Sequence, residues 1–411
     1  MIRARSERTL LFLVGAVQFV NVLDFMMVMP LGPDFAAALG IPTSRLGLVG
    51  GAYTFAAALS GIAGAGFLDR FDRRSALGAA MLGLVLATCT GGFATGFGTM
   101  LAARLLAGFF GGPATSLALS IVADQVPPER RGKALGSVMS AFSVASVLGV
   151  PAGLELARIG GWRLPFFAVA GLGLALAGSS LALMPPMRGH LEHAGGPPPS
   201  PLLRRPLVLL SLSGSATAFM ASFAIIPNIA AHLQLNLGYP RTRLGILYMA
   251  GGAVTFGTMR VGGHLVDRAG APAVASGATA LLLSVLAIGF AFPPAGLPVL
   301  PVFVAFMVAN STRNVSMSTL ATRVPEPAER ARFMSAQSAV QHLAAAAGAA
   351  LSSRILWESD GRLQGMTRLA AFCGALALPL PFLAAGVASG LRRRARGGTL
   401  RAPPTSPAPT G

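Results

Sequence analysis

Long apolar runs alternate along the whole chain with short segments that hold most of its charged residues. In the first half the runs cover roughly 9–31, 44–67, 76–95, 99–122, 134–157 and 163–184. In the second half they cover roughly 206–231, 243–266, 273–292, 299–322, 333–356 and 367–390. A helix needs about 20 mostly apolar residues to cross a bilayer. The pattern therefore predicts twelve transmembrane helices.

The composition supports lipid as the surroundings of these helices. Apolar residues make up 53% of the chain and charged residues 11%, whereas soluble proteins contain about 25% charged residues. A soluble fold with this composition would lack the polar surface needed to cover its core. We therefore expect an all-α membrane protein, with the lipid bilayer as its main contact.

Two kinds of charged loop recur about half a chain length apart. Residues 66–74 close the second apolar run, and residues 263–270 close the eighth. Residues 124–132 and 322–330 follow the fourth and tenth runs, and each contains a Val-Pro step and a Glu-Arg pair. Matching loops on one side indicate two six-helix bundles related by a pseudo-two-fold axis along the membrane normal.

The repeat also divides the chain into segments. A Pro- and Gly-rich stretch between the sixth and seventh runs has the composition of a linker, and the C-terminal residues have that of a disordered tail. The expected segments are an N-terminal six-helix bundle (1–184), a cytoplasmic linker (185–205), a C-terminal six-helix bundle (206–390) and a disordered basic cytoplasmic tail (391–411).

The basic residues predict the orientation. Most arginines, and the single lysine Lys133, flank the runs on the side that holds the N-terminus. Because positive residues favour the cytoplasmic side, both termini are predicted to be cytoplasmic in a multi-pass protein of the cell membrane. The formal net charge of +18 does not indicate nucleic-acid binding, since the arginines lie between apolar runs and form no basic, aromatic-interleaved face.

Three short motifs accompany this layout. The fourth run contains Arg104-Leu-Leu-Ala-Gly108. The fifth run contains Gly149-Val-Pro151-Ala-Gly153, whose small residues permit close helix packing and whose proline predicts a bend. The loops after the second and eighth runs share an Asp-Arg pair, and their candidate gate residues are Asp69, Arg70, Arg73, Arg74, Gly263, Asp267 and Arg268.

These motifs resemble the signatures of the major facilitator superfamily. The loops are similar to its Gly-x-x-x-Asp-Arg-x-Gly-Arg-Arg sequence, with Asp72 in place of the second glycine. Arg104 to Gly108 is similar to Arg-x-x-Gln-Gly, and the fifth-run motif resembles that of the twelve-span drug and metabolite efflux branch. The resemblance implies alternating access, a small-molecule substrate, and a proton gradient as the driving force with no bound cofactor. We expect a monomer.

Asp69 and Asp267 end long helices, where the helix dipole disfavours an anion. Each carboxylate therefore needs a cation or the N-terminus of another helix. Besides the arginines of the loop, the starts of the eleventh span near 332–335 and of the fifth near 133–136 are candidates from the opposite half. Such contacts would latch the halves on the cytoplasmic side. The alternative is a charged loop that only sets topology.

Asp24 and Arg104 lie deep in the first and fourth runs. At about 1.5 Å per residue, they lie roughly 24 Å and 27 Å from the cytoplasmic ends of their helices. The matching depths predict an ion pair, which either exchanges a proton or is a fixed structural pair. Glu155 is a second proton-coupling candidate; its alternative is an interfacial pair with Arg158 or Arg163.

Arg313 lies mid-span in a polar cluster of the tenth run and is predicted to line a central substrate cavity. The alternative is an arginine bonded to neighbouring helices, and His342 of the eleventh run is more often structural in such a place. The cavity candidates are Asn21, Arg104, Asn310, Arg313, Asn314, Gln341 and His342.

The favoured function is secondary active export of a drug, sugar or metabolite in exchange for protons. Proton-coupled import of a small polar metabolite is the alternative, and a sensor that no longer transports is a third hypothesis. The sequence contains no phosphate-binding loop of the ATP-driven type and no metal-ligand spacing, so an enzyme is not expected.

Overall fold

The computed structural model describes residues 4–188, 202–326 and 329–399. The first half contains α1 (Ala4–Met27), α2 (Gly32–Leu39), α3 (Leu46–Phe67), α4 (Arg73–Gly92), α5 (Phe97–Gln125), α6 (Pro128–Met139), α7 (Ala141–Val144), α8 (Val150–Gly160) and α9 (Leu164–Leu183). The second half contains α10 (Pro206–Ile225), α11 (Ile229–Ala231), α12 (Leu244–Ala269), α13 (Ala271–Leu286), α14 (Val299–Ala321), α15 (Arg330–Ile355), α16 (Met366–Ala377) and α17 (Leu380–Thr399).

Within these ranges, ten helical stretches are long and apolar enough to cross a membrane. The remaining two predicted spans are α14 and α15, which have 23 and 26 residues but a more polar composition. Both are long enough to cross at about 1.5 Å per residue. The twelve-span layout predicted by the apolar runs is thus consistent with the fold.

Several of the described spans are built from more than one helical piece. In the fifth, a π-helical turn (η3, Ala145–Gly149) separates α7 from α8 just before Pro151. Proline lacks the N–H of a regular turn, so a local widening at this point is expected. The seventh span continues through α11 to a second π turn (η7, His232–Asn236), and the twelfth joins α16 to α17.

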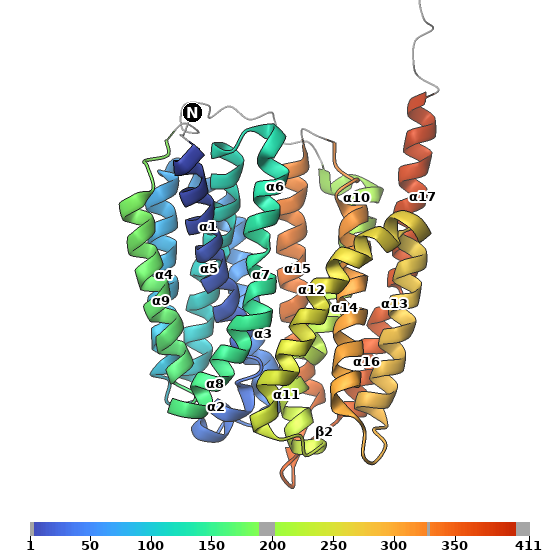
Figure 1. Ribbon diagram of the computed structural model, residues 1–411. Coiled ribbons are helices and arrows are strands. Elements are labelled where there is room, and N and C mark those ends of the chain that lie inside the picture. Colours follow the sequence, from blue (N-terminus) through green and yellow to red (C-terminus); the bar gives the residue numbers. More distant parts are fainter. Residues whose placement is uncertain (1–3, 189–201, 327–328, 400–411) are drawn as a thin grey trace, which may run out of the picture.

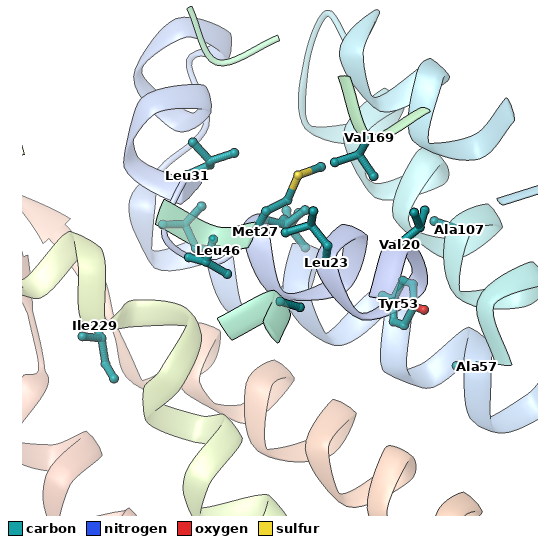
Figure 2. Close-up of a cluster of buried hydrophobic side chains, with 14 of the residues drawn as sticks. Val20, Leu23, Met27, Leu31, Leu46, Tyr53, Ala57, Ala107, Val169 and Ile229 are labelled. Carbon is teal, nitrogen blue, oxygen red and sulfur yellow. The ribbon is translucent and has the colours of Figure 1, made fainter. Parts of the chain in front are cut away.

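The two halves stand side by side, the first in blue to green and the second in yellow to red (Figure 1). Within the first half α3 packs on α5 and α4 on α9; within the second, α10 packs on α16 and α12 on α14. Buried apolar side chains such as Val20, Leu23 and Met27 of α1 fill the first half (Figure 2). The halves meet chiefly where α3 contacts α15 and where α8 and η3 contact α12.

The two ends of the bundle differ, and we name them by position. The N-terminus and the end of α17 lie at what we call the near end (Figure 1). The far end carries α2 and a two-stranded antiparallel hairpin, β1 (Trp357–Ser359) and β2 (Arg362–Gln364). The apolar pattern predicts neither element, since both are short and lie between spans.

The predicted linker and tail agree only in part with the structure. α17 continues to Thr399, so the first residues of the predicted disordered tail are helical. Arg394 donates to the carbonyl oxygen of Val324 at 3.1 Å and contacts Glu326, which holds this helical extension to the second half. Residues 189–201 of the linker and 400–411 of the tail lie outside the described residues.

Candidate functional site

A buried ion pair joins α1 to α5 in the middle of the first half. Asp24 and Arg104 have exposed fractions of 0% and 1%. The Asp24 carboxylate accepts hydrogen bonds from Nη1 of Arg104 at 3.1 Å and from Nη2 at 2.9 Å. Bidentate geometry of this kind gives the strongest carboxylate–guanidinium contact. The structure thus brings together the two residues that the sequence matched by depth.

Side chains that the sequence analysis did not single out complete this cluster. Thr88 of α4 donates from its hydroxyl to Asp24 at 2.7 Å. Tyr53 of α3 lies against the Arg104 guanidinium, 5.1 Å from ring centroid to Cζ, and donates its hydroxyl to the side-chain oxygen of Asn21 at 2.7 Å. Figure 2 shows the Tyr53 ring among apolar side chains. Thr88 could have been found from the sequence, because it is a polar residue inside the apolar run 76–95.

Small residues of α3 show where the halves touch. A Cβ placed on Gly47 would overlap the backbone carbonyl of Ala349 in α15, and one on Gly51 would lie 3.1 Å from the Ala349 side chain. Gly61 lies about four turns further along the same face of α3, and a Cβ there would meet nothing within 4 Å. The halves are therefore in close contact at the far-end part of α3.

α12 of the second half also approaches the opposite half closely, at its contact with η3 of the first half. A Cβ on Gly252 would lie 2.8 Å from the carbonyl oxygen of Ser146 in η3. Gly263 lies about three turns further along the same face and meets nothing within 4 Å. Both helices thus contact the opposite half closely in their far-end portions.

Polar contacts between the halves reinforce closure at the far end. Arg241, before α12, binds the Asp34 carboxylate of α2 through Nε at 2.8 Å and through Nη2 at 2.5 Å. Glu358 of β1 accepts from both the backbone N–H and the hydroxyl of Thr43, at 2.9 and 2.8 Å. The apolar pattern identified these residues only as loop positions, so sequence reasoning missed them.

The predicted near-end latch on Asp267 is not formed in this arrangement. The Asp267 carboxylate is 65% exposed and lies 3.8 Å from Arg323 of its own half. Arg73 contacts Asp124 at 3.3 Å, and Arg74 donates to the carbonyl of Leu181, so both arginines also have partners within their own half. Arg70, Arg268 and the motif glycine Gly263 lie at the same end, the two arginines exposed. The side chain of Asp69 lies outside the described residues.

Asp72, which stands in place of the second glycine of the family's loop motif, stabilises the start of α4 at the near end. Its carboxylate caps α4 by accepting from the backbone N–H groups of Arg74 and Ser75, at 2.9 and 3.2 Å. It also accepts from the backbone N–H of Met187 at 2.9 Å. The loop therefore starts the third span and holds the end of the sixth beside it.

Four of the seven cavity candidates are buried within the halves. Asn21, Arg104, Asn310 and Arg313 are each at most 7% exposed. Asn21 donates to the carbonyl of Gly111 at 2.9 Å, and Asn310 accepts from the hydroxyl of Ser222 at 2.5 Å. These amides tie helices together within a half, because burial leaves a polar group dependent on protein partners. Their expected place on a cavity wall stays a prediction, since in this structure they are buried within the halves.

The sequence predicted Arg313 either to line the substrate cavity or to bond to neighbouring helices, and the described part of the structure shows neither contact. Its side chain is fully buried in the second half, and none of its three guanidinium nitrogens has a hydrogen-bond partner among the described residues. The remaining candidates Asn314, Gln341 and His342 are partly exposed. Nδ1 of His342 lies 2.9 Å from the carbonyl oxygen of Ser338, one turn earlier, as in a structural histidine.

Glu155 lies apart from the buried cluster. Its carboxylate binds Arg158 through Nε at 2.9 Å and Nη2 at 2.6 Å, and both side chains are about half exposed. This is the interfacial pair that the sequence left as the alternative. Nearby, Gly149 packs against Leu23 of α1, where a Cβ would lie 2.7 Å from the leucine, and Gly153 lies beside Met27.

A two-half bundle of membrane-spanning helices, in which the halves meet closely at one end and each half holds buried charges, is the architecture of a secondary transporter. Residues 14–349 match the family model of the Major Facilitator Superfamily. The chain belongs to this family of membrane transporters, whose members are not enzymes.

Three similar proteins illustrate the match. The chloramphenicol resistance protein of Streptomyces lividans is 29% identical over 359 residues, which cover 86% of this chain and 90% of that protein. The purine ribonucleoside efflux pump NepI of Escherichia coli O157:H7 is 25% identical over 275 residues, covering 67% and 68%. A bacterial homolog of the human lysosomal transporter Spinster, solved inward-facing and occupied, has a TM-score of 0.75 at 17% identity, covering 94% and 98%.

Proposed function

We propose that this transporter exports a small molecule across the cytoplasmic membrane in exchange for protons, and that Asp24 takes up and releases the proton. The proposal is carried by one observation: the Asp24 carboxylate is fully buried at membrane depth and bonded to Arg104. Ionisable residues at such depth are costly and usually functional. The printed names of two relatives, a resistance protein and an efflux pump, support export.

The ion pair would act through α3, the helix of the first half that contacts α15 of the second half. Protonation of Asp24 removes the negative charge that holds Arg104. The hydrogen bonds that remain join a charged guanidinium to a neutral carboxyl group and are weaker than those of the ion pair. Arg104 packs on Tyr53, and Tyr53 belongs to α3, whose Gly47 contacts the second half. A change in the charge of Asp24 would thus alter the packing of a seam helix.

The distribution of arginines supports a cytoplasmic near end. In that orientation the structure corresponds to a state open to the cytoplasm. Asp24 has an exposed fraction of 0% in this state, so its proton would exchange in another state of the cycle. This order suits antiport, in which substrate and proton are carried in different steps of the cycle.

The test uses everted membrane vesicles with an acidic lumen and two labelled probes, chloramphenicol and inosine. We expect at least one probe to accumulate in the lumen only while the pH gradient is present. Asp24→Asn should abolish the dependence on the gradient, because the amide cannot exchange a proton. Uptake without a gradient, or unchanged gradient dependence of Asp24→Asn, would contradict the proposal.

Two controls sharpen the result. Glu155→Gln removes the carboxylate of the exposed Glu155–Arg158 pair and should leave accumulation unchanged. Accumulation only in right-side-out vesicles with an acidic exterior would instead identify import by symport, the alternative direction for the same ion pair.

A further inference from the structure

Four aromatic rings form a column that crosses the boundary between the halves. Tyr53 of α3 and Phe25 of α1 have ring centroids 5.0 Å apart. Phe25 stacks on Phe223 of α10 at 5.9 Å, with 28° between the ring planes. Phe223 stacks on Phe219, one turn earlier in α10, at 6.1 Å and 7°. We call these four residues the aromatic column.

The column lies next to a contact between the halves. A Cβ on Gly50 of α3 would be 3.7 Å from Pro227 of the second half, and Pro227 follows Phe223 by about one helical turn. Further toward the near end, a Cβ on Gly61 or Gly263 would meet nothing within 4 Å. The column therefore lies on the boundary between the halves, at the level of this contact.

The rings of the column are only partly covered. Tyr53 is 5% exposed, whereas Phe25, Phe219 and Phe223 are each of intermediate exposure. Met220 of α10 and Met26 of α1, next to these rings in sequence, are also partly exposed. Partly exposed aromatic and thioether groups form a surface that adapts to flat apolar ligands.

The charges beside the column favour a neutral ligand. Arg104 lies against Tyr53 but is paired with Asp24. A charged ligand here would compete with that pair or lose its hydration without compensation. A neutral aromatic ring needs no counter-charge and gains stacking energy from each ring that it meets.

We propose that the aromatic column binds a flat, neutral aromatic group of the transported molecule. The group enters from the near end, stacks on Phe219 and Phe223, and contacts Phe25 across the seam. Because Phe25 adjoins Tyr53, and Tyr53 packs on Arg104, the bound ring lies one contact away from the ion pair. This inference rests on the proposed function and specifies its substrate class.

The test measures equilibrium binding of labelled chloramphenicol, a neutral molecule with a nitrophenyl ring, to the full chain in lipid nanodiscs. We expect Phe219→Leu and Phe223→Leu each to weaken binding by about threefold to tenfold, as loss of one aromatic contact implies. Phe223→Tyr keeps a stacking ring and should retain affinity. Phe382→Leu is the matched control, because Phe382 is 78% exposed on α17.

Competition with phenyl and cyclohexyl β-glucosides isolates the requirement for a flat ring, since the two differ mainly in ring planarity. We expect the phenyl compound to compete more strongly, and this preference to disappear in Phe223→Leu. The proposal is overturned if the unaltered chain does not bind chloramphenicol, if the leucine variants bind it equally well, or if the two glucosides compete equally. Thermal stability of each leucine variant separates lost stacking from a damaged fold.

Failure of this inference can be told from failure of the proposed function. Stacking-dependent binding without gradient-driven accumulation would leave the aromatic site standing and remove proton-coupled export. Gradient-driven accumulation that survives Phe219→Leu and Phe223→Leu would leave the proposed function standing and remove the aromatic site.

Discussion

At the scale of single residues, the most informative contact is the Asp24–Arg104 pair. Two charges are kept dry and are satisfied mainly by each other, with Thr88 and Tyr53 as neighbours. Buried pairs of this kind add little net stability compared with apolar residues, but removal of one partner leaves an uncompensated charge. The presence of the pair is therefore better explained by a functional role than by a contribution to stability.

This reasoning predicts the outcome of a double-variant experiment. We expect Asp24→Leu and Arg104→Met each to destabilise the fold by about 3–5 kcal/mol, because each leaves one buried charge without its partner. The double variant should regain most of that stability and yet show no gradient-dependent transport. Thermal unfolding in detergent checks stability, and additive losses in the double variant would contradict the coupling.

The sequence could indicate this pair because helix depth follows from residue count, and Asp24 and Arg104 lie at matching depths. It could not indicate the Tyr53 ring beside them, since rotation of α3 about its axis is set by tertiary packing. The same limit applies to Asn310 and Arg313: their depth was evident, but the direction of their side chains was not. Both face the interior of a half.

At the scale of elements, the seam helices depend on glycine. α3 and α12 approach the opposite half most closely where Gly47, Gly51 and Gly252 leave room. In a membrane no hydrophobic driving force brings helices together, and small residues promote their association by allowing the backbones to approach closely. The position of each glycine along its helix therefore sets where the halves can close.

Gly47→Val should consequently open the far end. The added side chain would overlap the backbone of α15, which cannot move aside as a flexible side chain can. We expect the distance between spin labels at Ala38 and Ala295, on far-end segments of the two halves, to lengthen. Gly61→Val on the same face of α3 is the matched control and should leave the distance unchanged, since a Cβ there has free space. Equal distances in both variants would show that Gly47 does not limit closure.

The apolar runs predicted most elements because each span is long and uniformly apolar. They did not predict the hairpin β1–β2, whose three-residue strands are too short for a periodic signal. They also placed the start of the disordered tail too early. Leu391 to Arg394 continue a helix that is already formed, and Arg394 has partners in the loop after α14.

At the scale of the whole molecule, the described contacts between the halves gather at the far end. The far end combines the glycine seams with the Asp34–Arg241 and Thr43–Glu358 contacts. The near-end acid Asp267 is exposed. An alternating-access cycle requires the opposite arrangement as a second state, in which Asp267 would reach the opposite half as the latch hypothesis expects.

Weakening the far end should therefore favour that second state. Arg241→Met removes the bidentate contact to Asp34 across the halves. We expect far-end label distances to lengthen and the near-end distance between labels at Gly132 and Arg268 to shorten. Arg158→Met removes an exposed pair within the first half and serves as the control. Lengthening at the far end without shortening at the near end would argue against a rocking motion.

The dry setting of Asp24 bears on how the cell's energy is conserved. In this conformation the Asp24 carboxylate has no exposed surface. Protons from the surrounding water therefore cannot reach it and pass through the protein across the bilayer. An idle copy would then leave the proton-motive force intact, and the gradient would be drawn down only when cargo is actually carried.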